Sequence, residues 1–177
     1  MIMSTAKELQ TLKKQNEAPE WLTEESYRML RGTYLLKGET PRQMWQRVSD
    51  SSARYLNRMD LASKFFELMW KNWLGLATPV AANTGTTRGL PISCFSVYVP
   101  DSIDGIMSSM HELASMTKNG GGVGVHWNGV RPQGSTIRGN GKSEGVVPFI
   151  KIQDSTTIGV SQGGVRRGAS EIGRAHV

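Results

Sequence analysis

The chain has 177 residues, of which 38% are hydrophobic and 20% are charged, values typical of a globular protein that can bury a core. It contains no apolar run of the roughly 18 residues that span a membrane, and no apolar segment of a secretory signal near its N-terminus. Its net charge of +6 is dispersed along the chain without interleaved aromatic residues, which argues against a nucleic-acid-binding surface.

Residues 1–75 are predicted to be helical. Thr23 is the expected N-cap of a helix whose first turn carries Glu24 and Glu25, and Thr40-Pro41 begins a second helix. A third helix is expected from Leu61 to Leu74. Its apolar face comprises Phe65, Phe66, Met69, Trp70 and Trp73. We interpret these large apolar side chains as core residues.

From residue 76 onward, glycine becomes frequent and short strands alternate with helices. The pattern predicts strands over 92–99 and 122–127. Helices are expected from a cap at Asp101 or Ser102 to about Met116, and from Pro148 to about Val160. This alternation indicates an α/β layer or barrel over 76–170, following the helical region 1–75.

The last seven residues, 171–177, differ from this pattern. Their sequence can be encoded by a string that looks like a common sequencing-library adapter, so we expect a non-native tail and a sheet left unfinished before it.

Cys94 is the only cysteine of the chain. It cannot form an internal disulfide, which fits a reducing compartment and a cytoplasmic protein. In a strand, alternation places Cys94 on the face opposite Phe95, Val97 and Val99. The thiol is therefore either a small hydrophobe or a redox group beside a bound nucleotide.

Two glycine-rich segments, 120–124 and 161–168, could hold phosphate groups with their backbone amides or could be ordinary tight turns. Segment 136–143 ends like a phosphate-binding P-loop but has Thr136 where the first glycine is required. His111 and Glu112 begin a zinc-like pattern that Ser115 breaks, so no metal site is expected. Asp101 and Asp104 either cap a helix or bind a nucleotide.

Taken in order, the segments resemble the large, catalytic subunit of ribonucleotide reductase. The matching segments are 25–30, 38–41, 78–79, 93–94, 101–103, 121–124, 131–139, 144–149 and 161–169. The run Ser-Gln-Gly-Gly-Val-Arg-Arg-Gly-Ala at 161–169 is the most specific of them. The resemblance implies an incomplete ten-stranded α/β barrel after the helical region, and a radical-based reduction of ribonucleotides to deoxyribonucleotides for DNA synthesis.

The resemblance also implies site residues. Cys94 matches the reducing cysteine on the first barrel strand, which becomes half of a disulfide. The other positions that match the substrate site are Thr78, Ser93, Gly121, Gly122, Gln162 and Arg166. The positions that match the specificity site, where ATP or a deoxynucleotide binds as effector at a homodimer interface, are Asp101, Ile103, Arg131 and Ile137.

The implied partners are a small metal-containing subunit that supplies the radical and thioredoxin or glutaredoxin as reductant; nucleic acid and membrane are not expected. Because the radical comes from that separate subunit, no cofactor is expected to bind this fragment. The family's radical-cysteine loop is missing from the 177 residues, so we expect no reductase activity from this chain alone. Ribonucleoside diphosphates are the favoured substrates. Two alternatives stay open: an adenosylcobalamin-dependent reductase, and a non-catalytic nucleotide-binding half of a split enzyme.

Overall fold

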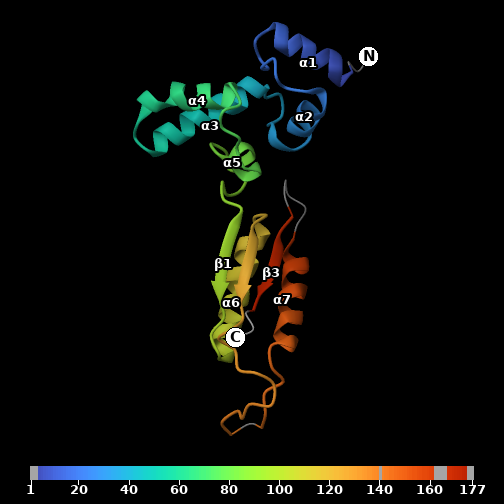
Figure 1. Cartoon of the computed structure of the whole chain (residues 1–177), viewed down its shortest axis with the longest axis vertical. Coiled ribbons are helices and arrows are strands. Elements are labelled where there is room, and N and C mark those ends of the chain that lie inside the picture. Colours follow the sequence, from blue (N-terminus) through green and yellow to red (C-terminus); the bar gives the residue numbers. More distant parts are fainter. Residues whose placement is uncertain (1–3, 140, 162–166, 175–177) are drawn as a thin grey trace. The chain divides into compact units, whose positions relative to one another are not determined.

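The computed structural model describes residues 4–139, 141–161 and 167–174, and Figure 1 shows the course of the chain. The chain divides into two compact units, residues 1–92 and 93–177. The change in composition predicts a boundary after residue 75, whereas in the structure the segment around Thr78 belongs to the helical unit. Within the described residues, no helix is both long enough and apolar enough to cross a membrane.

The first unit is helical. Its α-helices are α1 (Thr5–Lys14), α2 (Glu24–Met29), α3 (Pro41–Tyr55), α4 (Ala62–Trp70) and α5 (Thr78–Asn83). A π-helical turn, Leu30–Tyr34, continues α2, and a short 3₁₀ turn, Met59–Leu61, precedes α4. Two buried clusters hold the unit together, one around Met44, Trp45 and Met69, and one around Leu9, Leu22 and Tyr27.

Both predicted helix starts are confirmed. The Thr23 side chain accepts a hydrogen bond from the amide of Ser26, and Thr40 and Gln43 form a reciprocal capping box with Pro41 in the first turn. These side chains satisfy amide groups that the first turn of a helix leaves without an intrahelical partner.

The third predicted helix ends earlier than expected. Asn72 adopts a left-handed backbone with φ of +58°, which stops the helix after Trp70. Trp73 is therefore 70% exposed instead of lying on the apolar face, and the Lys71 ammonium lies 4.8 Å from the centre of its ring. The placement of Trp73 in the core was wrong, whereas Met69 is buried as predicted.

The second unit is a parallel three-stranded sheet with its helices on one face. The strands are β1 (Cys94–Tyr98), β2 (Gly122–His126) and β3 (Ala169–Gly173), in the order β1-β2-β3. Helices α6 (Ile103–Lys118) and α7 (Val147–Val160) make the crossovers, and Figure 1 shows them running along the strands. Parallel strands joined through helices are the α/β arrangement that the alternating pattern predicted.

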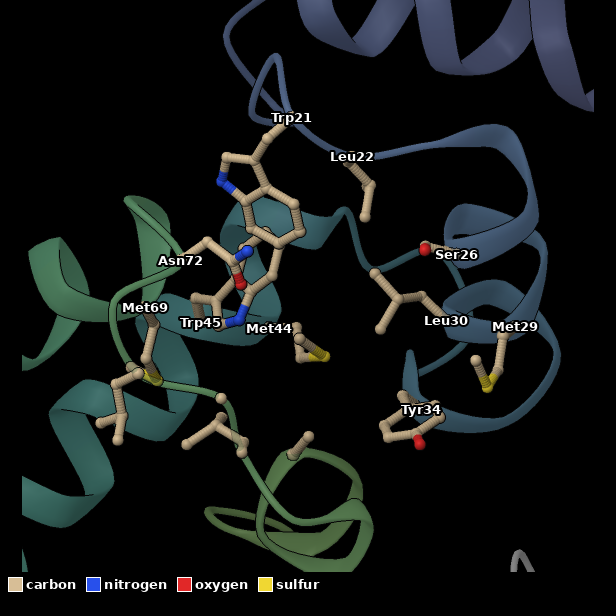
Figure 2. Close-up of a pocket in the computed structure, with 14 residues that line it drawn as sticks. Trp21, Leu22, Ser26, Met29, Leu30, Tyr34, Met44, Trp45, Met69 and Asn72 are labelled. Atoms are coloured by element: carbon tan, nitrogen blue, oxygen red, sulfur yellow. The ribbon is translucent and has the colours of Figure 1, made fainter.

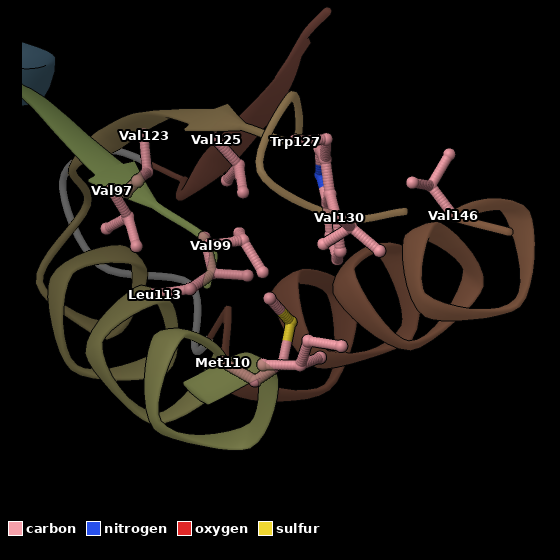
Figure 3. Close-up of a cluster of buried hydrophobic side chains, with 10 residues drawn as sticks. Val97, Val99, Met110, Leu113, Val123, Val125, Trp127, Val130 and Val146 are labelled. Atoms are coloured by element: carbon pink, nitrogen blue, oxygen red, sulfur yellow. The ribbon is translucent and has the colours of Figure 1, made fainter. Parts of the chain in front are cut away.

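One buried cluster joins the sheet to these helices, as Figure 3 shows. Val97, Val123 and Val125 point from the strands toward Met110 and Leu113 of α6. At the end of β2 the buried Trp127 donates its indole N–H to Gln153 of α7 at 2.7 Å. The apolar face of β1 is thus the one predicted, and the other face carries Cys94.

β3 was not anticipated. It includes residues 171–173, which were expected to belong to a tail outside the fold. In the structure Glu171 and Ile172 instead pair with Gly124 and Val125 of β2.

Candidate functional site

The thiol of Cys94 lies at the first position of β1. The side chain is exposed, and its sulfur lies 3.5 Å from the hydroxyl oxygen of Ser93. The residue paired with it on β2 is Gly122, which has no side chain to cover the thiol. The strand therefore presents Cys94 on an open part of the sheet, on the side away from α6 and α7.

The glycines of 120–122 use their amides within the protein. Gly120 and Gly121 donate to the carbonyls of Thr117 and Met116, which ends α6, and Gly122 donates to the carbonyl of Ser93, which starts the sheet. Amides engaged in this way are not available to a phosphate. Of the two interpretations of this segment, the structure favours the tight turn.

Gly121 is needed for close packing. A Cβ atom added there would lie 2.6 Å from the ring of Phe95 and 2.9 Å from the carbonyl oxygen of Met116. Both distances are shorter than real Cβ contacts, so only glycine lets the end of α6 meet the start of β2 at this separation.

The residues predicted to contact substrate divide between the two units. Ser93, Cys94, Gly121 and Gly122 belong to the second unit, where sheet pairing and the Gly122–Ser93 hydrogen bond bring them together. Thr78 belongs to the first unit, at the start of α5. Gln162 and Arg166 lie outside the described residues.

The four residues predicted to bind an effector line a single cavity of about 280 Å³ in the second unit. They are Asp101, Ile103, Arg131 and Ile137. Three different segments supply them: the turn after β1 with the start of α6, the turn after β2, and the hairpin that precedes α7. The side chain of Ser102 caps α6 by accepting from the amide of Gly105, so Asp101 is left to face the cavity.

Asp101 and Arg131 pair with each other in this cavity. The Arg131 Nε donates to Asp101 Oδ2 at 2.8 Å, and the Arg131 amide donates to Asp101 Oδ1 at 3.3 Å. A further guanidinium nitrogen, Nη1, donates to the carbonyl of Thr136 at 3.2 Å. The ion pair is about one-third exposed at both ends, so solvent and small ligands can reach it.

The hairpin itself is closed by backbone bonds. Gly134 donates to the carbonyl of Ser143, Ser143 donates to that of Ser135, and Ile137 donates to that of Gly141. Thr136 and Lys142 form an antiparallel bridge. Segment 136–143 is thus part of a hairpin and not the strand-to-helix turn of a P-loop. This agrees with the sequence, which has Thr136 where a P-loop requires its first glycine.

Two residues in the surroundings of α5, Tyr34 and Arg88, were not singled out from the sequence. The hydroxyl oxygens of Tyr34 and Thr78 lie 3.0 Å apart, and the Arg88 guanidinium donates to the carbonyls of Tyr34 and Ala82, each at 2.9 Å. The contacts of Tyr34 with Thr78 and with Arg88 span 44 and 54 positions, so no local pattern could have revealed them.

Tyr34 also lines an apolar cavity of about 210 Å³ in the first unit, which Figure 2 shows. Trp21, Trp45, Met44 and Met69 make up much of its wall. The described residues contain no group of three or more His, Cys, Asp or Glu side chains that could hold a metal ion.

Comparison with known proteins gives the same order as the structure, with a helical domain followed by an α/β domain. The sequence profile of the ribonucleotide reductase all-alpha domain matches residues 20–89, and that of the ribonucleotide reductase barrel domain matches residues 92–172. The barrel match extends into β3, as far as Ile172.

Named relatives agree with these profiles. The chain is 34% identical over 161 residues to a ribonucleoside-diphosphate reductase subunit alpha of Synechocystis, covering 87% of the chain and 21% of that protein. It is 36% identical over 148 residues to the ribonucleoside-diphosphate reductase large subunit of Arabidopsis thaliana, covering 80% of the chain and 18% of that protein. The chain thus spans about a fifth of the length of these relatives.

A solved structure is also similar. The alpha subunit of the class Id ribonucleotide reductase of Actinobacillus ureae superposes with a TM-score of 0.73 at 34% identity, over 86% of the chain and 28% of that subunit. With an all-alpha domain followed by the start of a barrel domain, in that order, the chain belongs to the large-subunit family of ribonucleotide reductase.

Proposed function

We propose that this chain is part of a ribonucleoside-diphosphate reductase large subunit, an oxidoreductase that converts ribonucleotides to deoxyribonucleotides for DNA synthesis. The observation that carries the proposal is the exposed thiol of Cys94 at the start of β1, in a chain that both reductase domain profiles match in order.

Cys94 is the proposed reducing thiol. In the overall reaction two thiols give two protons and two electrons: the 2′ C–O bond of the ribose breaks, the oxygen leaves as water, a C–H bond forms at that carbon, and the thiols become a disulfide. Cys94 is the only cysteine in the 177 residues, so the second thiol must come from outside them. A dithiol protein of the thioredoxin or glutaredoxin kind then restores both thiols by exchange.

Substrate orientation is assigned to a small set of polar groups, some in the second unit and one in the first. Ser93 lies beside Cys94, and the paired Gly122 leaves room for a nucleotide against the sheet. Thr78 contributes a hydroxyl from the start of α5. Gln162 and Arg166 are proposed to read the substrate base in response to the effector. A few polar groups on rigid elements are typical of a small-molecule site.

The cavity around Asp101 and Arg131 is the proposed effector site for ATP or a deoxynucleotide. The carboxylate can accept from a sugar hydroxyl, and the guanidinium can pair with phosphate. Because Arg131 is already paired with Asp101, a bound phosphate must compete for it. At about 280 Å³ the cavity is slightly smaller than typical ligand sites, as expected for one that a second subunit completes in a homodimer.

We favour a class I enzyme, in which a separate metal-containing subunit supplies the radical. The alpha-subunit names of the relatives and the class I neighbour support this assignment over the adenosylcobalamin-dependent and split-enzyme alternatives. The lone cysteine fits the cytoplasm, the compartment that we propose.

The test uses the full-length large subunit that carries this sequence, purified with its radical-generating subunit. With cytidine diphosphate and a dithiol reductant, we expect formation of deoxycytidine diphosphate that depends on both subunits and responds to ATP. If neither diphosphates nor triphosphates are reduced under any effector, the proposed function is wrong.

A further inference from the structure

The hydroxyl of Thr78 is held by a residue from a distant part of the chain. Its Oγ1 lies 3.0 Å from the phenolic oxygen of Tyr34, and both side chains are partly buried. Thr78 starts α5, but Ala77 is the N-cap and no side chain caps this helix. The Thr78 hydroxyl is therefore not engaged in capping, and Tyr34 is its described partner.

Tyr34 reaches Thr78 from a π-helical turn. The turn Leu30–Tyr34 is closed by the amide of Leu35, which donates to the carbonyl of Leu30 at 2.9 Å. A π turn contains one residue more than an α turn, which shifts the following side chains around the helix axis, and such turns are frequent at functional sites. In Figure 2 the ring of Tyr34 lines the apolar cavity, and its hydroxyl lies on the side of the ring away from Leu30.

Arg88 fixes the two backbones that carry these hydroxyls. A single nitrogen, Nη2, donates to the carbonyls of Thr33 at 3.4 Å, of Tyr34 at 2.9 Å and of Ala82 at 2.9 Å. The first two carbonyls end the π turn, and the third lies in α5. The separation of the hydroxyls is therefore set by the backbone as well as by the side chains.

The chemistry of the pair gives the hydrogen bond a direction. A phenol is far more acidic than an aliphatic alcohol, so Tyr34 is the better donor and Thr78 the better acceptor. A hydroxyl that accepts one hydrogen bond keeps its own hydrogen free and becomes a stronger donor. Thr78 can then donate to an acceptor oxygen, such as those of the ribose or the phosphates of a nucleotide.

We infer that Tyr34 is a positioning residue for nucleotide binding: its hydroxyl holds Thr78 Oγ1 so that Thr78 donates to an oxygen of the substrate. The inference rests on the proposed function, because it takes the Thr78 hydroxyl as part of the substrate site.

The test is a double-mutant cycle in the full-length subunit with its radical-generating partner, using Tyr34→Phe, Thr78→Val and the double variant. We expect Tyr34→Phe to raise KM for cytidine diphosphate about 3- to 10-fold, the effect of one neutral hydrogen bond, with kcat little changed. In the Thr78→Val background the same substitution should leave KM unchanged, because the hydroxyl it positions is gone. Thr78→Ser keeps a hydroxyl and should retain most of the affinity.

The matched control is Tyr55→Phe, which removes the same hydroxyl from a side chain that is 92% exposed and should leave KM unchanged. An equal increase in KM from Tyr34→Phe with and without Thr78 would overturn the inference, as would no increase or a loss of folding. An inactive wild-type enzyme would instead contradict the proposed function, so the two failures are distinct.

Discussion

At the residue scale, the feature with the clearest chemical consequence is the thiol of Cys94. It is exposed at the first position of β1, and its sulfur lies 3.5 Å from the hydroxyl oxygen of Ser93. Cys94→Ala should therefore leave the fold and effector binding intact while abolishing turnover of the full-length enzyme, because the disulfide cannot form. The control is Ser96→Ala, two positions along the same exposed face, which should stay active. Measurable multiple turnover by Cys94→Ala would exclude this thiol as the reductant.

Tyr27 gives a prediction for alkaline pH. Burial, the hydrogen bond to Glu8 and the charge of Glu8 together raise the pKa of Tyr27 to about 12 from an ordinary value of 10.0. The folded state therefore keeps the phenolic proton more tightly than the unfolded state. The contribution to stability is complete below pH 10 and is lost as the pH rises through the folded pKa.

The measurement is the free energy of unfolding against pH for wild type and Tyr27→Phe. Below pH 10 the variant should be less stable by about 1 kcal/mol, since one hydrogen bond is lost while Glu8 keeps Arg31 at 2.6 Å. Between pH 10 and 12 the difference should shrink, because only wild type loses stability through this group. A constant difference would show that the phenol does not titrate differently on folding.

At the element scale, the start of α3 depends on Thr40. Its side chain accepts from the Gln43 amide and donates to Glu17 at 2.6 Å. Thr40→Ala should cost about 1 kcal/mol of unfolding free energy, the usual value of an N-cap, and somewhat more for the lost Glu17 bond. Thr11→Ala makes the same change at an exposed position of α1. It removes a hydrogen bond to the Lys7 carbonyl, but the higher helix propensity of alanine should offset that loss, so we expect it to be nearly neutral. Equal melting curves for the two variants would contradict the capping role.

The junction between α6 and β2 depends on Gly121. The Cβ of Gly121→Ala would overlap the Phe95 ring and the Met116 carbonyl, so we expect a loss of about 1–3 kcal/mol in chemical denaturation. Gly124→Ala adds the same methyl group within β2, where the nearest atom would be 3.9 Å away, and should cost far less. Similar losses for both would show that glycine is required here for another reason.

Local patterns predicted the elements better than their ends. Caps at Thr23 and Thr40 act within three residues, and strand alternation acts within two, so both were visible in the sequence. The end of α4 was missed because it depends on a left-handed Asn72, a conformation that many residues avoid but asparagine tolerates without requiring it. β3 was missed because residues 171–173 were assigned to the tail, and because this mostly exposed strand lacks the apolar alternation that marked β1.

In the candidate site, too, the sequence identified individual residues but not their contacts across distant segments. The resemblance named Asp101, Ile103, Arg131 and Ile137 from separate segments, and the structure brings them around one cavity. The resemblance could not show that Asp101 and Arg131 pair with each other, since the ion pair depends on how closely the turns after β1 and β2 approach one another. The contact of Tyr34 with Thr78 was likewise beyond any local pattern.

At the scale of the whole molecule, the sheet order leaves two strands with one partner each. Among the described strands, β1 and β3 pair only with β2. Unpaired amides and carbonyls along an edge strand offer a template for pairing with another copy. We therefore expect the isolated 177-residue chain to self-associate through these edges.

A charge placed on an edge strand separates this mechanism from general insolubility. Ser96 is exposed in β1, and Ser96→Lys should reduce self-association in sedimentation velocity experiments, because a lysine disfavours strand addition. Ser115→Lys adds the same charge to an exposed position of α6, away from the strand edges, and should change association little. Equal improvement by both would mean that net charge and not edge pairing controls association. A wild-type chain that stays monomeric would show that neither edge is available for pairing.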